Sequence, residues 1–169
     1  MKNPELFHKT VGILVNAYFN DVLISGDCHA CAVGNIVAAN CGYSIQEAPN
    51  RYYEWIDKKG NLVHVHWVNV FYTSVVRFFG IRLGIIREFD SDNIGIREEK
   101  EILSTGYNVV ELAKIESAFE CGQKGFTAST RMFNGIIATV DALIDIHNGS
   151  NLDRAEAKQL FKKELTEIG

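Results

Sequence analysis

The segment from Cys28 to Asn40 constrains the fold more than any other part of the chain. It reads Cys-His-Ala-Cys-Ala-Val-Gly-Asn-Ile-Val-Ala-Ala-Asn. Nearly every side chain in it is apolar or small, so a helix formed here has no wide polar face to turn toward water. We therefore predict a helix over residues 28–40 at the centre of the fold. Asp27 is its expected N-cap, Gly34 and the alanines permit close backbone approach, and Gly42 ends it.

Hydrophobic periodicity predicts further helices around this one. Residues 4–19 carry an apolar stripe at spacings of four, three and four, which is typical of an amphipathic helix. Asn108 is followed by Glu111 at capping-box spacing, so we expect a helix to begin there. A second helix is predicted over residues 130–148, and a third near Asp153. Each has an apolar face that has to pack against a neighbour.

The middle of the chain has a different character. Tyr52–Ile56 and Leu62–Val68 are rich in aromatic and β-branched residues, and Lys58–Asn61 lies between them. This pattern predicts a β-hairpin around residues 52–70. Arg97–Glu101 is expected to be a charged, solvated stretch. The sequence therefore predicts a mainly α (α+β) protein, a single helical domain over residues 1–169 with a small inserted hairpin.

Composition narrows the classes of function. The chain is 47% hydrophobic and 11% aromatic, enough for a substantial core. Its net charge of −4 provides no general attraction to nucleic acid or to an anionic membrane. No stretch approaches the roughly 18 apolar residues of a membrane span. The first 25 residues lack the pattern of a secretory signal, so we expect a cytoplasmic protein with reduced cysteines.

Cys28 and Cys31 provide the most distinctive chemistry. At the start of a helix, the positive end of the helix dipole would stabilise a thiolate and lower the thiol pKa. The simplest interpretation is nevertheless structural, because free cysteine is often a small buried hydrophobe. We expect Cys41 and Cys121 to be core residues of that kind.

A structural zinc site is one alternative for the pair. His64 and His66 alternate along the predicted strand, so both would point to the same face. Together with Cys28 and Cys31 they would supply two sulfurs and two nitrogens, a suitable shell for zinc. The competing interpretation is that both histidines are polar residues on the exposed face of the hairpin.

A cysteine hydrolase is the other alternative. Asp27-Cys28 opens a buried helix, Asn40-Cys41-Gly42-Tyr43 follows it, and His64-Val65-His66-Trp67-Val68 comes later. This arrangement resembles papain-like cysteine peptidases, nearest to the group that trims bacteriocin leaders. The resemblance implies Cys28 as nucleophile and His64 or His66 as base. Residues 20–27 contain no glutamine that could complete an oxyanion hole.

Asp141, Asp145 and His147 share the predicted helix 130–148. Paired carboxylates one turn apart with a nearby histidine could hold a metal or exchange protons. The apolar stripe occupies the opposite face of the helix, so we predict that these residues form its solvated side.

Several segments together carry a wider resemblance. They are Cys28–Asn35, Thr105–Tyr107, Glu111–Glu116 and Phe133–Ile136. They resemble a group of small uncharacterised proteins from gut bacteria of the Bacteroides type and their phages. The resemblance implies a mostly helical cytoplasmic protein of phage or mobile-element origin, and it implies no activity. With no complete catalytic set in view, we predict a non-catalytic accessory or regulatory protein. Its expected partner is another protein, not nucleic acid or membrane.

Overall fold

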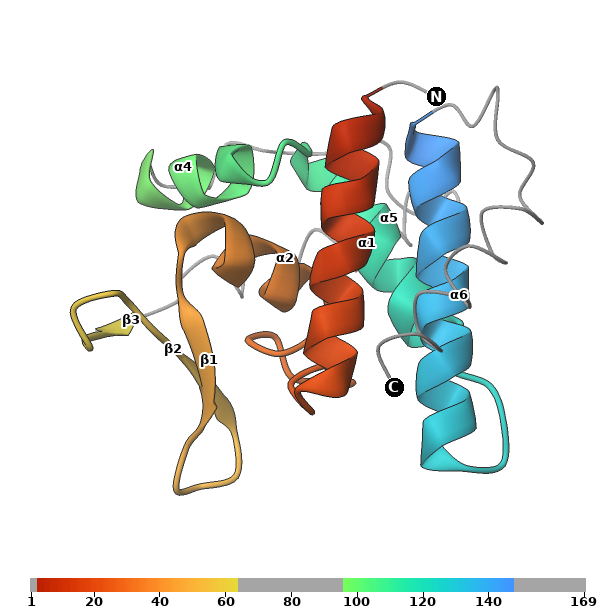
Figure 1. Ribbon diagram of the computed structural model, residues 1–169, viewed down its shortest axis with the longest axis horizontal. Coiled ribbons are helices and arrows are strands. Elements are labelled where there is room, and N and C mark those ends of the chain that lie inside the picture. The colour runs from red at the N-terminus through yellow and green to blue at the C-terminus, as the bar shows by residue number, and fades with distance from the viewer. Residues whose placement is uncertain (1–2, 64–95, 148–169) are drawn as a thin grey trace, which may run out of the picture.

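The computed structural model describes residues 3–63 and 96–147 (Figure 1). Within these ranges the protein is mainly helical with one small antiparallel sheet, which confirms the predicted fold class. None of the described helices has both the length and the apolar character needed to cross a bilayer. The elements in chain order are α1 (Pro4–Phe19), α2 (Ala32–Cys41), β1 (Ser44–Glu47), β2 (Tyr53–Ile56), β3 (Leu62–Val63), α4 (Ile96–Ser104), α5 (Val109–Cys121) and α6 (Ala128–Ile146).

The helix α2 lies at the centre and contacts α1, α4, α5 and β1 (Figure 1). The predicted central helix is thus confirmed, but its predicted start is wrong. Cys31, not Asp27, is the N-cap, and its sulfur accepts a hydrogen bond from the Gly34 N–H. The residues before it form a tight loop that the small side chains of α2 allow to pack closely. Gly42 ends α2 with a φ of 75°, as predicted.

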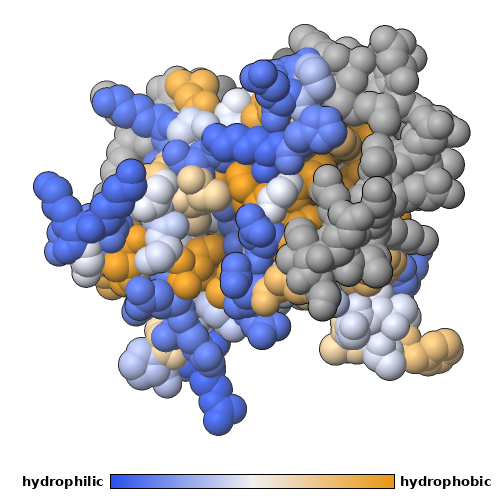
Figure 2. Space-filling model, in the orientation of Figure 1, coloured by the Kyte–Doolittle hydropathy of each residue, from blue (hydrophilic) through white to orange (hydrophobic). Residues whose placement is uncertain are grey.

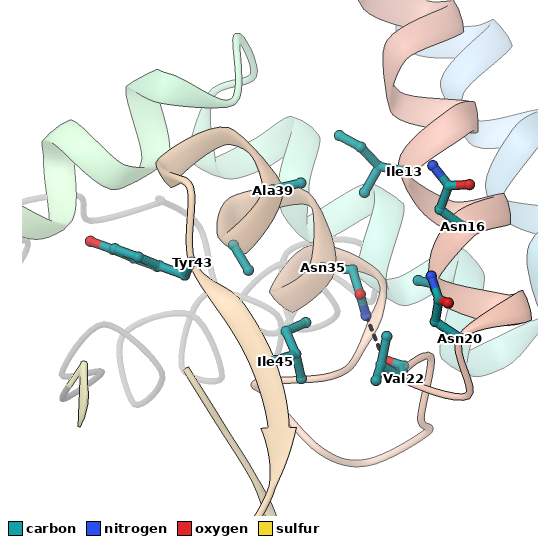
Figure 3. Close-up of a pocket in the computed structure, with 10 residues that line it drawn as sticks. Ile13, Asn16, Asn20, Val22, Asn35, Ala39, Tyr43 and Ile45 are labelled. Carbon is teal, nitrogen blue, oxygen red and sulfur yellow. Dashed lines mark hydrogen bonds between the residues drawn. The ribbon is translucent and has the colours of Figure 1, made fainter. Parts of the chain in front are cut away.

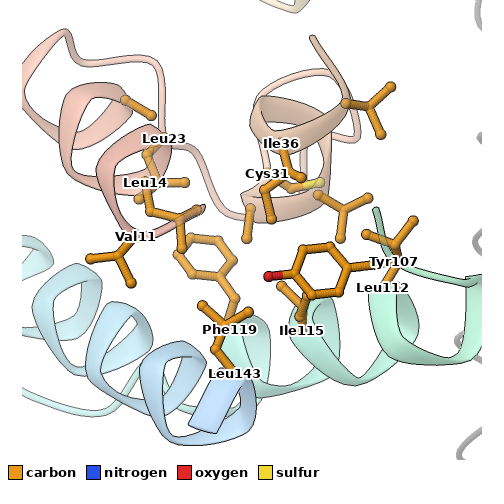
Figure 4. Close-up of a cluster of buried hydrophobic side chains, with 14 of the residues drawn as sticks. Val11, Leu14, Leu23, Cys31, Ile36, Tyr107, Leu112, Ile115, Phe119 and Leu143 are labelled. Carbon is orange, nitrogen blue, oxygen red and sulfur yellow. The ribbon is translucent and has the colours of Figure 1, made fainter. Parts of the chain in front are cut away.

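The helices α1, α4 and α5 pack against α2, and α6 packs against α5 and α1. The helix α1 has the predicted bounds, and α5 begins with the predicted capping box between Asn108 and Glu111. The helices α5 and α6 pack side by side (Figure 1). The predicted helix near Asp153 lies outside the described residues. Side chains from α1, the loop before α2, α2, α5 and α6 meet in one apolar cluster (Figure 4), which includes Val11, Leu14, Leu23, Cys31, Ile36, Leu112, Ile115, Phe119 and Leu143.

A chain of buried polar groups joins α1 to the end of α6. The Tyr107 hydroxyl lies 2.9 Å from Thr10 Oγ1 and 2.9 Å from His147 Nε2. Burial raises the pKa of Tyr107 to about 12, so the hydroxyl keeps its proton. The prediction that His147 belongs to a solvated face is therefore wrong, because the histidine is buried and hydrogen-bonded.

The sheet has the strand order β1-β2-β3, with both pairs antiparallel. The pairing of β2 with β3 confirms the predicted hairpin over its described part, and residues 64–70 lie outside it. The strand β1 was not predicted, because Ser44–Glu47 holds only one β-branched residue among polar ones. The charged stretch Arg97–Glu101 belongs to α4, and the prediction that it is solvated is wrong for Glu101. Lys100 is exposed, but the Glu101 carboxylate is buried and accepts a hydrogen bond from the Tyr43 hydroxyl.

Candidate functional site

Two carboxyl groups of α5 hold the loop Ser25–Cys31, which we term the cysteine loop, and the first turn of α2 that follows it. Glu120 accepts hydrogen bonds from Ser25 Oγ at 2.6 Å and from the Gly26 N–H at 2.9 Å. Glu116, one turn earlier, accepts from the Val33 N–H at 3.0 Å. Since Glu116 is buried, burial raises its pKa to about 7. The sequence analysis missed the roles of both glutamates. The available signal was the position of Glu116, which lies four residues after Leu112 and three before Phe119 and so falls on the apolar face of the helix.

The sheet and α2 hold the other side of the cysteine loop. The Asp27 carboxylate accepts from the His29 N–H at 2.9 Å and from the Tyr53 N–H at 3.0 Å. Trp55 Nε1 donates to the His29 carbonyl at 2.7 Å. A Cβ atom on Gly34 would lie 2.4 Å from the Cys28 carbonyl oxygen, so only glycine fits there. This confirms the predicted close backbone approach at Gly34.

The four thiols differ in their surroundings. Cys31 is buried, and burial followed by the neighbouring Glu116 raises its pKa well above the ordinary value. The prediction of a dipole-stabilised thiolate is therefore wrong for Cys31, because desolvation and a nearby carboxyl outweigh the helix dipole. Cys28 and Cys41 are partly buried. Cys121 is exposed, so its predicted place in the core is wrong.

His64 and His66 lie outside the described residues. Among residues 3–63 and 96–147, no group of three or more His, Cys, Asp or Glu side chains is arranged to hold a metal ion. The zinc site at Cys28, Cys31, His64 and His66, and the hydrolase with Cys28 and a histidine base, both stay predictions.

A pocket of about 450 Å³ opens on the opposite side of α2 from α5 (Figure 3). Its walls are the second half of α1 and the strand β1, and α2 forms its floor. Asn35 projects from that floor and is 5% exposed. Its side-chain nitrogen donates to the carbonyls of Val22, Ala30 and Cys31 at 2.8 to 3.0 Å. The lining residues are Ile13, Asn16, Ala17, Asn20, Val22, Asn35, Ala38, Ala39, Tyr43 and Ile45.

Three asparagines make this pocket chemically specific. Asn16 and Asn20 reach it from α1, and neither side chain has a hydrogen-bond partner among the described residues (Figure 3). The carbonyl oxygen of Asn35 accepts no hydrogen bond from them either, because only its nitrogen is engaged. Each amide can both donate and accept. The pocket therefore suits a polar, uncharged group or a peptide unit with apolar contacts beside it.

The free edge of β1 borders the same pocket. The Ala48 N–H donates to the Tyr52 carbonyl at 2.6 Å. In an antiparallel pair only every second residue exchanges backbone hydrogen bonds with the neighbouring strand, so every second residue before Ala48 bonds to β2. Gln46 therefore bonds inward to the sheet. The N–H and C=O groups of Ile45 and Glu47 point outward, away from β2, and no described residue pairs with them. In Figure 1 this edge faces α1.

Comparisons with known proteins identify no relative. No family model, no curated protein and no solved structure matches the chain. The function that the site supports therefore rests on the geometry of the described residues.

Proposed function

We propose that the protein is a non-catalytic binding protein that captures an extended segment of a partner protein along β1. The observation that carries the proposal is the juxtaposition of an open strand edge with an asparagine-lined pocket. Ile45 belongs to both, since its backbone groups face outward and it lines the pocket. A partner strand paired with β1 would place alternate side chains over the pocket floor.

The size and composition of the pocket support this mode of binding. A space of about 450 Å³ is at the lower end of the range for ligand sites and accommodates one or two side chains. Its apolar members, including Ile13 and Val22, would gain by losing contact with water. Figure 2 shows the same side as Figure 1, where apolar and hydrophilic surface lie next to each other between β1 and α1.

The short strand sets the strength of the interaction. Only Ile45 and Glu47 present outward backbone groups, and each hydrogen bond contributes about 1 kcal/mol net. The ladder alone is too weak for specific capture, so the side chain that enters the pocket has to provide much of the affinity. This predicts a partner recognised through a short, specific segment. An accessory or regulatory role suits such an interaction.

Selection of random decapeptides on the immobilised protein tests the proposal. Individual peptides are then measured by fluorescence anisotropy against the wild type, Glu47→Pro and Glu47→Ala. Proline removes an N–H that the sheet does not use, so the fold should survive while pairing at the edge is blocked. We expect Glu47→Pro to weaken binding at least tenfold.

The matched variant Glu47→Ala keeps the N–H and, like proline, lacks the carboxylate. It should therefore retain edge pairing, and circular dichroism should give all three proteins the same melting temperature within a few degrees. Peptides that bind Glu47→Pro as tightly as the wild type would contradict the proposal. Failure to enrich any peptide above a blank surface would contradict it as well.

A further inference from the structure

We infer that the segment bound along β1 carries a lysine or arginine, placed at the end of the pocket where Asp21 and Glu47 lie. This inference rests on the proposed function and adds the chemistry of the partner. It follows from the distribution of charge around the pocket, which is negative at one end and positive at the other.

The negative end contains two exposed carboxylates on opposite walls. Asp21 lies between Asn20 and Val22, which both line the pocket, and Glu47 lies two residues beyond the lining residue Ile45. Both side chains act on one group, Tyr53. Burial first, and then the carboxylates of Glu47, Asp27 and Asp21, raise the pKa of Tyr53.

Asp21 and Glu47 are available to a ligand. Asp27 is already engaged, because its carboxylate accepts hydrogen bonds from the His29 and Tyr53 N–H groups. Asp21 and Glu47 are exposed and form no ion pair within the described part of the chain. A cationic side chain at this end of the pocket would be attracted by both carboxylates, and charge-assisted hydrogen bonds are stronger than neutral ones.

The opposite end of the pocket carries a net positive charge. Two lysines lie near it, together with one buried carboxylate, Glu101, which accepts from the hydroxyl of the lining residue Tyr43. Lys9 Nζ donates to Asn40 Oδ1 at 2.6 Å, and Asn40 directly follows the lining residue Ala39. Lys58 passes over Gly42, where a Cβ would lie 2.7 Å from its Cε atom. A segment with its cationic residue at this end would meet like charge, so the charge distribution also selects the register and direction of the segment.

Synthetic peptides taken from the selection, each with one basic residue, provide the test. Binding is measured at low and moderate salt against wild type, Asp21→Asn, Glu47→Gln and the charge reversal Glu47→Lys. We expect enriched peptides to share one basic position, and Glu47→Gln and Asp21→Asn each to weaken binding several-fold. Glu47→Lys should weaken it more, and a peptide with glutamate at the basic position should recover binding to that variant.

The outcomes separate this inference from the proposed function. Peptides that lose binding on Glu47→Pro but show no basic preference, and no response to the charge variants, would overturn the inference and leave the proposed function intact. Absence of any enriched peptide would overturn both. A concentration-dependent dimer in sedimentation velocity that Glu47→Pro abolishes would identify a second copy of this chain as the occupant, and would also overturn the inference.

Discussion

The cysteine loop and the β1 edge have opposite hydrogen-bonding states. The N–H groups of Gly26 and His29 in the loop, and of Val33 just beyond it, each donate to a carboxyl oxygen. At the edge, the outward groups of Ile45 and Glu47 meet no described partner. The backbone groups of the segment with the most distinctive sequence are thus already hydrogen-bonded within the protein. The polar strand β1, whose sequence is not distinctive, keeps backbone groups that can still bind a partner.

This difference has a thermodynamic basis. A buried polar group without a partner costs about 1 to 3 kcal/mol, so the loop is stable only with its anchors in place. Exposed groups at a strand edge are hydrated and cost nothing to leave open. Substitutions in the cysteine loop should therefore strongly change the stability of the protein, whereas substitutions at the β1 edge should change its binding.

Among the variants, Gly34→Ala should lower stability most, because it disrupts the packing of the cysteine loop on α2. The added Cβ would lie 2.4 Å from the Cys28 carbonyl oxygen and 2.7 Å from the His29 backbone. The loop would have to move off α2 and lose hydrogen bonds, at a cost of about 4 kcal/mol. Urea unfolding at pH 7 measures the loss, and labelling by iodoacetamide should show that the protected Cys31 becomes reactive.

Gly12→Ala is the matched control. No atom lies within 4 Å of a Cβ built on Gly12, which is inside α1. Alanine should therefore stabilise the helix by about 0.5 to 1 kcal/mol. If both variants unfold at the same urea concentration, the close packing of the cysteine loop on α2 is not what fixes Gly34.

Glu116→Gln should sharpen the comparison by making the loop anchor insensitive to pH. Burial raises the pKa of Glu116 from an ordinary value of 4.5 to about 7, so the folded state holds the proton more tightly than the unfolded state. Wild-type stability should therefore fall as pH rises from about 4.5 to 7 and level off above that. Glutamine can still accept from the Val33 N–H and carries no charge.

The variant should match the wild type near pH 4.5 and exceed its stability at pH 8 by up to about 3 kcal/mol. Urea unfolding at both pH values measures the difference, and the exposed Glu47→Gln is the matched control for the loss of one carboxylate. An unaltered pH profile in Glu116→Gln would show that this carboxyl does not titrate with folding.

The sequence predicted the elements whose signals are local. The stripe of α1, the Asn108–Glu111 capping box and the central apolar helix were all identified correctly, because periodicity and caps act over a few residues. The errors come from contacts between distant residues. No residue close to Cys31 in the sequence indicates that Glu116 lies beside it and raises its pKa. The burial of His147 likewise depends on its hydrogen bond to Tyr107, 40 residues away.

The same reasoning explains why the candidate binding site was missed. The strand β1 is a strand only because β2 lies beside it, and its free edge matters only because α1 and α2 form a pocket there. Asn35 was predicted to lie on the central helix, but its part in fixing the Val22 carbonyl depends on tertiary packing. A pocket built from three elements leaves no contiguous pattern for sequence analysis to detect.

Arg51→Gly should produce the smallest effect and tests the hairpin that presents the open edge. Arg51 has a φ of 67°, and its N–H donates to the Ala48 carbonyl at 2.9 Å, which places a left-handed residue at the position where such hairpins prefer glycine. Glycine removes a strain of about 1 to 2 kcal/mol but costs more backbone entropy on folding, so the expected gain is about 0.5 to 1 kcal/mol.

Arg51→Ala is the control, since it shortens the side chain and retains the strain. In urea unfolding, glycine should be more stable than alanine, while Cys31 labelling stays as slow as in the wild type. Equal stability of the two variants would mean that the turn relaxes freely, and that the hairpin contributes little to positioning the β1 edge.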